Sequence, residues 1–322
     1  MRTQIPFALL AATLASSVFS VPAHARARVF VASYGNDSNP CTFGSPCKTF
    51  QQAVNIVDAG GEVTAIDSAG FGPINITKAV TITSPDGVEA GIVPAVGGDA
   101  ININAGPTDA VVLLGLTLNG SGIAYNGIVF NPGASLTVTN CVAQNFVTDG
   151  TAFTGNGIII QPTSGTVNFT IINTTAVNNT NRGVFYFPQS GSPNVNGVID
   201  HVVANANLHG IFFYTGSVSG GTTIVTISNS IVSGDNSAGI VLNGVVGTIN
   251  ASIDNVSASA DGTGVVALGN VNALLGRSVI TGNTTGVLNN TMNTFYTYGD
   301  NRINLNAADI SGAALNTTFK TQ

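Results

Sequence analysis

Residues 127–130 read Gly-Ile-Val-Phe, and this pattern of a glycine followed by apolar residues returns along much of the chain. Successive glycines of the pattern are 30, 26, 27, 29, 25 and 22 residues apart. Self-similarity at a period of roughly 20 to 50 residues is the mark of a repeat architecture. The chain is therefore a stack of similar units, which begin at Gly127, Gly157, Gly183, Gly210, Gly239, Gly264 and Gly286.

A second signature lies between these glycines, an alternating strand that ends in a polar turn residue and precedes another short strand. Each repeat thus holds about three strands of roughly three to five residues, too short to bury an apolar face alone. The side-chain period is two, which excludes an amphipathic helix. The alternating strands cover residues 136–140, 169–173, 198–201, 225–229, 249–255 and 274–277.

Stacking solves the burial problem, because strands of neighbouring coils can pair in parallel at about 4.8 Å and share one core. The sequence predicts an all-β, right-handed parallel β-helix of about nine coils over residues 74–295. A β-sandwich is the alternative, but it does not require a glycine at near-constant spacing. At the polar turn most coils carry an asparagine, which tolerates left-handed backbone. The residues at this turn are Asn140, Asn173, Asn229 and Asn255, with His201 and Arg277 replacing asparagine in two coils.

Both ends of such a rod need covers, since an open end exposes strand edges and core. Residues 26–73 are predicted to form the N-terminal cap, with a short helix over residues 48–57. Cys41 and Cys47 lie in a loop just before it and are predicted to form a disulfide; a metal site is the alternative. Residues 296–322 are expected to depart from the repeat and to close the C-terminal end. Cys141 lies in an apolar strand and is expected to be a buried thiol.

The first 25 residues are predicted to be a signal peptide, with Arg2, an apolar run and a small-residue cleavage site at Ala23-His24-Ala25. The mature chain is then periplasmic or secreted, and it contains no further segment that predicts a membrane span. Charged residues make up only 7% of the chain and the net charge is −6. Nucleic acid is excluded as a partner, because the chain has few lysine and arginine side chains that could face the phosphates.

The cap and the repeat together carry a family resemblance. The segments 30–37, Asn39-Pro40-Cys41, 46–50 and 67–72, followed by the coil repeat, resemble exported proteobacterial β-helix proteins of the pectate-lyase-like superfamily. The resemblance implies the right-handed parallel β-helix. For function it implies a polysaccharide lyase, hydrolase, esterase or epimerase, or else an adhesin or fibre, and the fold alone does not choose.

Enzymes of this kind need carboxylate clusters. A calcium-dependent lyase needs several carboxylates and an outward base, and a hydrolase needs paired aspartates on one strand. Neither motif is present, so calcium is considered but no cofactor or metal site is predicted. The best constellation has Asp200 or His201 as the base and Arg182 orienting an anionic substrate. His209, Asp254 and Arg277 are expected beside it as substrate-binding residues, with Asp200 and Asp254 in one outward column.

An aromatic column is the second candidate feature. If the residues one and three past each glycine point inward, four aromatic residues of two neighbouring coils point outward. They would form an exposed patch that binds sugar rings, unless a long turn covers them. These residues are Phe185, Phe187, Phe212 and Tyr214.

Two functions remain open from the sequence. The first is an exported protein that binds or processes a polysaccharide or cell-surface glycan along the outer face of the β-helix. The second is a non-catalytic surface, matrix or adhesion protein that uses the β-helix as a rod. The superfamily favours the first, and the scarcity of charge favours the second.

Overall fold

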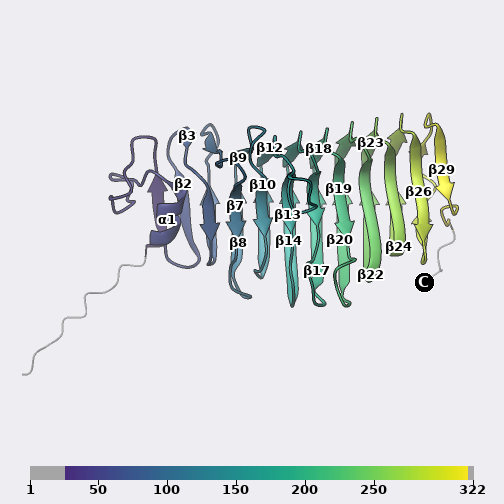
Figure 1. The fold of residues 1–322 in the computed structure, drawn as a ribbon, viewed down its shortest axis with the longest axis horizontal. Helices are drawn as coiled ribbons and strands as arrows, with labels where there is room; N and C mark the ends of the chain where they lie inside the picture. The colour runs from purple at the N-terminus through teal and green to yellow at the C-terminus, as the bar shows by residue number, and fades with distance from the viewer. Residues whose placement is uncertain (1–25, 318–322) are drawn as a thin grey trace, which may run out of the picture.

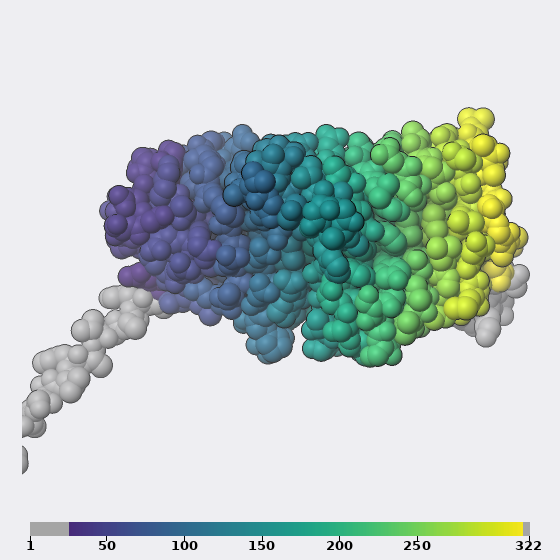
Figure 2. All heavy atoms as spheres, viewed as in Figure 1, coloured from purple at the N-terminus to yellow at the C-terminus, as the bar shows by residue number. Residues whose placement is uncertain are grey.

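The computed structural model describes residues 26–317, and the predicted signal peptide lies outside these described residues. The chain winds into an elongated rod whose strands stack along the long axis in chain order (Figure 1). The space-filling view shows one continuous body that runs from the N-terminal cap to the last coil (Figure 2). Within residues 26–317, no helix has the length and apolarity that a membrane crossing requires.

The first face of the rod holds the strands that carry the repeat glycine. Each pairs in parallel with the equivalent strand of the next coil, for example β16 with β19. From the N-terminal end they are β4 (Ile74–Ile76), β7 (Asp99–Ile103), β10 (Asn126–Phe130), β13 (Asn156–Ile160), β16 (Arg182–Tyr186), β19 (His209–Tyr214), the first part of β22 (Ala238–Asp254), the first part of β24 (Thr263–Gly276), β26 (Thr285–Thr291) and β29 (Ala308–Gly312).

The second face holds the alternating strands, again in parallel register from coil to coil. In two coils the first and second faces are a single long strand, so β22 and β24 belong to both. The other strands of this face are β1 (Arg28–Val31), β2 (Gly61–Ala65), β5 (Val80–Thr83), β8 (Ala110–Leu114), β11 (Ser135–Thr139), β14 (Thr166–Ile172), β17 (Asn194–Asp200), β20 (Thr222–Ser228) and β27 (Phe295–Thr297).

The third face is a separate sheet of ten short strands. Ten strands stacked in order mark about nine turns between them, so the predicted parallel β-helix is confirmed. The strands are β3 (Ala69–Gly70), β6 (Ala90–Ile92), β9 (Leu116–Asn119), β12 (Val142–Gln144), β15 (Thr175–Val177), β18 (Val203–Asn205), β21 (Ile231–Ser233), β23 (Ser257–Ser259), β25 (Val279–Thr281) and β28 (Arg302–Ile303).

The core runs the length of the rod and is filled by the residues predicted to point inward. In the first face these are the residues one and three past the glycine, such as Ile158 and Ile160 of β13, both fully buried. Alternate residues of the second face, such as Ile227 and Ile253, meet them from the other side. Cys141 is buried in the same core, and burial raises the pKa of its thiol to about 11.

The polar turn between the second and third faces has the predicted left-handed backbone. The four asparagines there, with His201 and Arg277, have φ between 48° and 54°. We call these six residues the outer ladder. Asn255 donates from Nδ2 to Oδ1 of Asn229 at 2.7 Å, so neighbouring side chains bond along the axis.

The predicted short helix and disulfide are present at the N-terminal end, although β1, β2 and β3 of residues 26–73 already pair within the stacked faces. Helix α1 (Phe50–Ile56) begins at Thr49, whose side chain accepts a hydrogen bond from the backbone N–H of Gln52. Asp37 accepts hydrogen bonds from the backbone N–H groups of Lys48 and Thr49 and so fixes the start of the helix. The predicted disulfide between Cys41 and Cys47 is present beside it.

The C-terminal end differs from the prediction. Residues 296–322 were expected to depart from the repeat, but β28 pairs with β25 and β29 pairs with β26. The described part of this segment therefore adds a further coil. Ile310 stands in the column of the buried Val287 but is 44% exposed, because no later described strand packs on it.

Candidate functional site

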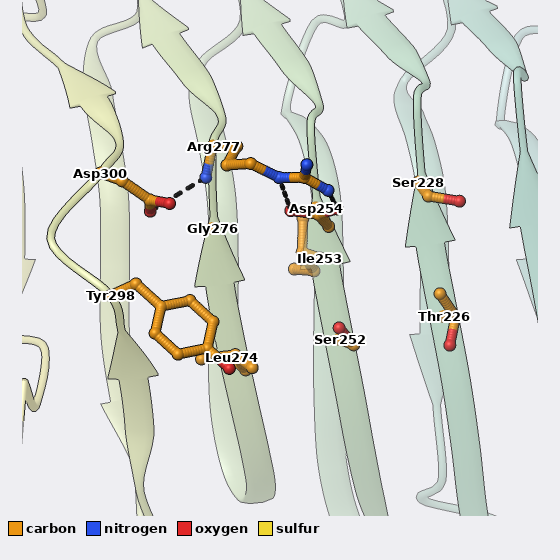
Figure 3. Close-up of a pocket in the computed structure, with 10 residues that line it drawn as sticks. All are labelled: Thr226, Ser228, Ser252, Ile253, Asp254, Leu274, Gly276, Arg277, Tyr298 and Asp300. Atoms are coloured by element: carbon orange, nitrogen blue, oxygen red, sulfur yellow. Dashed lines mark hydrogen bonds and ion pairs between the residues drawn. The ribbon is translucent and has the colours of Figure 1, made fainter. Parts of the chain in front are cut away.

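A groove of about 440 Å³ lies on the second face near the C-terminal end, and we call it the outer groove (Figure 3). Its volume falls within the range of roughly 300 to 1,000 Å³ that is typical of small-molecule sites. A neighbouring hollow of about 310 Å³ shares Thr226, Ser252 and Leu274 with it, so the two form one trough. The groove is lined by Thr226, Ser228, Ser252, Ile253, Asp254, Leu274, Gly276, Arg277, Tyr298 and Asp300.

Strand register builds this groove, since outward residues of β20, β22, β24 and β27 stand in columns across the coils. Gly276 has no side chain in its column, and a Cβ there would lie 3.3 Å from Asp254 Oδ1 and 3.4 Å from the ring of Tyr298. The glycine therefore leaves the floor of the groove open. The columns are Thr226–Ser252–Leu274–Tyr296 and Ser228–Asp254–Gly276.

An acidic and basic cluster occupies the upper rim of the groove (Figure 3). Arg277 donates from Nε to Oδ1 of Asp254 at 2.9 Å and from Nη2 to Oδ2, a two-point ion pair. Its backbone N–H donates to Oδ1 of Asp300 at 3.1 Å. The hydrogen bond from Arg277 holds the pKa of Asp254 below its ordinary value. Asp254 is therefore ionised at neutral pH and already paired.

The second polar cluster surrounds Asp200, at the end of β17. Its Oδ1 accepts from Ser228 Oγ at 2.6 Å and from Asn229 Nδ2 at 2.7 Å, and its Oδ2 lies 2.7 Å from His201 Nδ1. The hydrogen bond from Ser228 is the main reason that the pKa of Asp200 lies below its ordinary value. Asp200 thus orients the exposed His201 ring while remaining ionised.

The register confirms that Asp200, Ser228 and Asp254 stand in one outward column. Asp200 and Asp254 are two coils apart, about 10 Å at the usual strand spacing. Ser228 lines the groove, and Asp200 with His201 lies one coil beyond it. The structure therefore brings Asp254 and Arg277 into one site and places Asp200 and His201 at its edge.

Arg182 and His209 lie elsewhere. Both are on the first face, at the start of β16 and β19, whereas Asp200 and His201 end the second face. The guanidinium of Arg182 lies 4.0 Å from the ring centre of Phe185 and 4.9 Å from that of Phe212. Burial lowers the pKa of Arg182 to about 10, and burial together with Arg182 lowers that of His209 to about 4. The predicted grouping of Arg182 with Asp200 is not formed.

The aromatic column is present, but the prediction that it is exposed is wrong for two of its members. Phe185 and Phe187 point away from the core, yet they are only 1% and 8% exposed. Phe153, from the turn before β13, packs on Phe187 with ring centres 5.4 Å apart. Phe212 and Tyr214 are half-buried against the same cluster. A turn covers the column, so these rings are packed hydrophobic surface.

Three residues of the trough were missed from the sequence: Tyr298 and Asp300 of the outer groove, and Tyr296 of the neighbouring hollow. A signal for them existed, because the columns through Leu274 and Gly276 continue into the next coil. They were missed because the segment after residue 295 was expected to leave the repeat. Among residues 26–317, no group of three or more His, Cys, Asp and Glu side chains could hold a metal ion.

The solved structures that resemble this chain include the following two. One is pectate lyase Pel9A, with 15% identity over 85% of this chain and 72% of that chain, at a TM-score of 0.45. The other is a rhamnogalacturonan lyase, with 10% identity over 83% of this chain and 73% of that chain, at a TM-score of 0.32. No protein-family model and no curated protein matches the chain. The parallel β-helix that the sequence resemblance implied is the fold that the strand pairing shows.

Proposed function

We propose that the protein binds a polysaccharide chain in the outer groove. The observation that carries the proposal is a long open trough with tyrosines at one end and hydroxyl, amide and charged groups along it. Tyr298 is 62% exposed at the groove. A tyrosine offers an apolar face to the C–H surface of a sugar ring and a hydroxyl to its polar edge.

Polar groups beside this ring suit a ligand that is rich in hydroxyls. Asn272 donates from Nδ2 to Oδ1 of Asn250 at 2.8 Å, which fixes the direction of both amides on the floor of the trough. Ser252 and Thr226 add hydroxyls in the neighbouring column. Such a row of donors and acceptors, repeated from coil to coil, matches a chain of repeating sugars better than a compact ligand.

Binding without hydrolysis is the form of the proposal that the carboxylates favour. Hydrolysis of a glycosidic bond needs one carboxyl group that is protonated and can act as an acid. Asp254 and Asp200 both have pKa values below the ordinary one, because Arg277 and Ser228 hydrogen-bond to them. Neither carboxyl is therefore tuned to donate a proton.

The test is binding of the secreted chain, residues 26–322, to an array of plant, algal and bacterial polysaccharides. Any ligand found is then titrated against the wild type, Tyr298→Ala and Arg277→Ala. We expect both substitutions to weaken binding at least tenfold, because the first removes the stacking surface and the second leaves Asp254 unpaired. A reducing-end assay on the same ligand is expected to show no new chain ends.

Tyr34→Ala is the matched control, because Tyr34 is 69% exposed on the N-terminal cap, far along the rod. It is expected to bind as the wild type does. The proposal fails if no polysaccharide binds, or if Tyr34→Ala weakens binding as much as Tyr298→Ala. New chain ends that depend on Asp200 would replace it with an enzymatic function.

We also propose that the protein acts outside the cytoplasm. The disulfide between Cys41 and Cys47 supports this, since disulfides persist in oxidising compartments. Fractionation of cells that express the full chain tests it. Recovery of the chain in the cytosolic fraction with Cys41 and Cys47 reduced would contradict it.

A further inference from the structure

A second polar ladder runs inside the rod, at the turn between the third and first faces, and we call it the inner ladder. The Oδ1 atom of each ladder member accepts a hydrogen bond from the preceding coil. For example, Asn207 Oδ1 accepts from the backbone N–H and from the Nδ2 of Asn179, both at 3.1 Å. The members of the ladder are Asn179, Asn207, Asp235, Asp261, Asn283 and Asn306.

The asparagines of the ladder use both hydrogens of the amide. The second hydrogen goes to a backbone carbonyl of the third face, from Asn207 Nδ2 to Ala176 at 3.1 Å. Asn283 Nδ2 makes the same bond to Ala258 at 3.1 Å. The position of Nδ2 therefore requires a donor, because it faces an acceptor carbonyl.

At two coils the donor is replaced by a carboxyl oxygen. Asp235 Oδ2 and Asp261 Oδ2 are buried and have no hydrogen-bond partner. The register places the carbonyls of Ala204 and Val232 where Asn207 has that of Ala176. Asp235 Oδ2 also lies 2.6 Å from the Cβ position of Gly210, the same place that Asn207 Nδ2 occupies beside Gly183.

We propose that Asp235 and Asp261 are neutral carboxylic acids in the folded protein, each donating its proton where asparagine donates an amide hydrogen, and that losing these protons destabilises the coils around them. A carboxylate there would hold the acceptor oxygen Oδ2 against an acceptor carbonyl, away from water, which is costly. The inference is independent of what the outer groove binds.

Within residues 26–317, no cation acts on these carboxyls. The ladder positions beside them are Asn207 and Asn283, and strands β19 and β22 present Gly210 and Gly239. Among the described residues, the titratable group that acts on Asp235 is Asp261, and its ionisation would raise the pKa of Asp235 further. His209 lies next to Gly210, but its ring packs outside on Phe212.

Burial raises the pKa of Asp235 to about 8, with a contribution from Asp261, and raises that of Asp261 to about 7. In the unfolded chain both lie near the ordinary 3.8. Between these values the folded state holds more protons than the unfolded state, so stability falls as pH rises. The stabilising contribution is complete below about pH 4 and is lost as the pH passes through 7 to 8.

The experiment compares thermal melts of the disulfide-intact chain at pH 5 and pH 9, for the wild type and for Asp235→Asn with Asp261→Asn. Asparagine is the ladder's own residue and supplies the missing donor, so the variant is expected to fold. We expect the melting temperature of the wild type to fall by at least about 5 °C more than that of the variant between the two pH values. Asp86→Asn, at an exposed turn, is the control and should behave as the wild type.

A direct readout is the infrared C=O stretch of a protonated carboxylic acid at pH 5.5. It should be strongest in the wild type, weaker in each single variant and weakest in the double variant, where Asp99, whose pKa burial raises, is the remaining contributor. The proposal is overturned if the wild type lacks this band. It is also overturned if the double variant keeps the full pH dependence of the melting temperature.

Discussion

The repeat glycine is required because the atoms packed around it leave no room for a side chain. Gly239 does not have a left-handed φ, yet a Cβ there would lie 2.7 Å from Asp261 Oδ2 and 2.9 Å from the carbonyl of Gly264. Gly239→Ala is therefore expected to lower the free energy of unfolding by about 2–3 kcal/mol, because the added methyl overpacks the turn. Urea unfolding followed by circular dichroism measures this.

Gly44→Ala is the control, since no atom lies within 4 Å of its Cβ position in the cap loop. Its unfolding free energy should remain within about 0.5 kcal/mol of the wild type. If Gly239→Ala were equally mild, close packing would not explain why the repeat keeps its glycine.

Gly239 also shows which part of the repeat could be predicted from the sequence. The glycine and its spacing were visible and predicted the coil, but the sequence did not give the reason for the glycine. That reason is the inner ladder, whose members up to Asn283 precede the repeat glycine by three or four residues, as Asp235 precedes Gly239 and Asn207 precedes Gly210. The spacing could have indicated the ladder, but the burial of Asp235 could not be seen without the packing around it.

Arg277 is expected to contribute to glycan binding and not to the stability of the fold. Its φ of 50° suits asparagine better than arginine, and its ion pair with Asp254 is solvent-exposed. Arg277→Asn is expected to leave the melting temperature within about 2 °C of the wild type or to raise it. The same variant should weaken glycan binding in the outer groove. A large drop in the melting temperature would mean that the arginine is kept for the fold.

At the scale of elements, the outward rings of β16 and β19 stabilise the rod. Phe185 is 1% exposed and stacks on Phe187 with ring centres 5.1 Å apart. Phe185→Ala is expected to cost about 3–5 kcal/mol of unfolding free energy, as for a buried phenylalanine. Urea unfolding measures the loss, and polysaccharide binding at permissive temperature should remain unchanged. Loss of binding without loss of stability would mean that this aromatic cluster does belong to the polysaccharide-binding site.

The cover over these rings could not be predicted from the strand pattern. Alternation placed Phe185 and Phe187 outside correctly, because side chains alternate across a strand. Whether these outward rings are exposed to solvent depends on the path of the turn that carries Phe153. The period of the strands does not specify that path. The outer groove was predicted only in part. Asp254 and Arg277 belong to the regular columns of the repeat, whereas Tyr298 lies in a coil that was not expected.

At the scale of the whole molecule, the two ends of the rod are unlike. The N-terminal strand β1 is covered by the loop of the disulfide, where Val31 bridges to Cys47. At the other end, Ile310 of β29 is 44% exposed. In a solenoid each coil contacts its neighbours only, so a change at one end acts locally.

Removal of the disulfide tests this locality. The bridge closes a short loop with a sequence separation of 6, for which the chain-entropy estimate is roughly 2 kcal/mol. In Cys41→Ser with Cys47→Ser, amide hydrogen exchange should accelerate in α1, β1 and β2 and remain slow in β22 and β24. Glycan binding in the outer groove should be retained, because the groove lies in distant coils. Reduced wild type should behave as the double variant does, whereas equal acceleration along the whole rod would mean that the coils unfold as one unit.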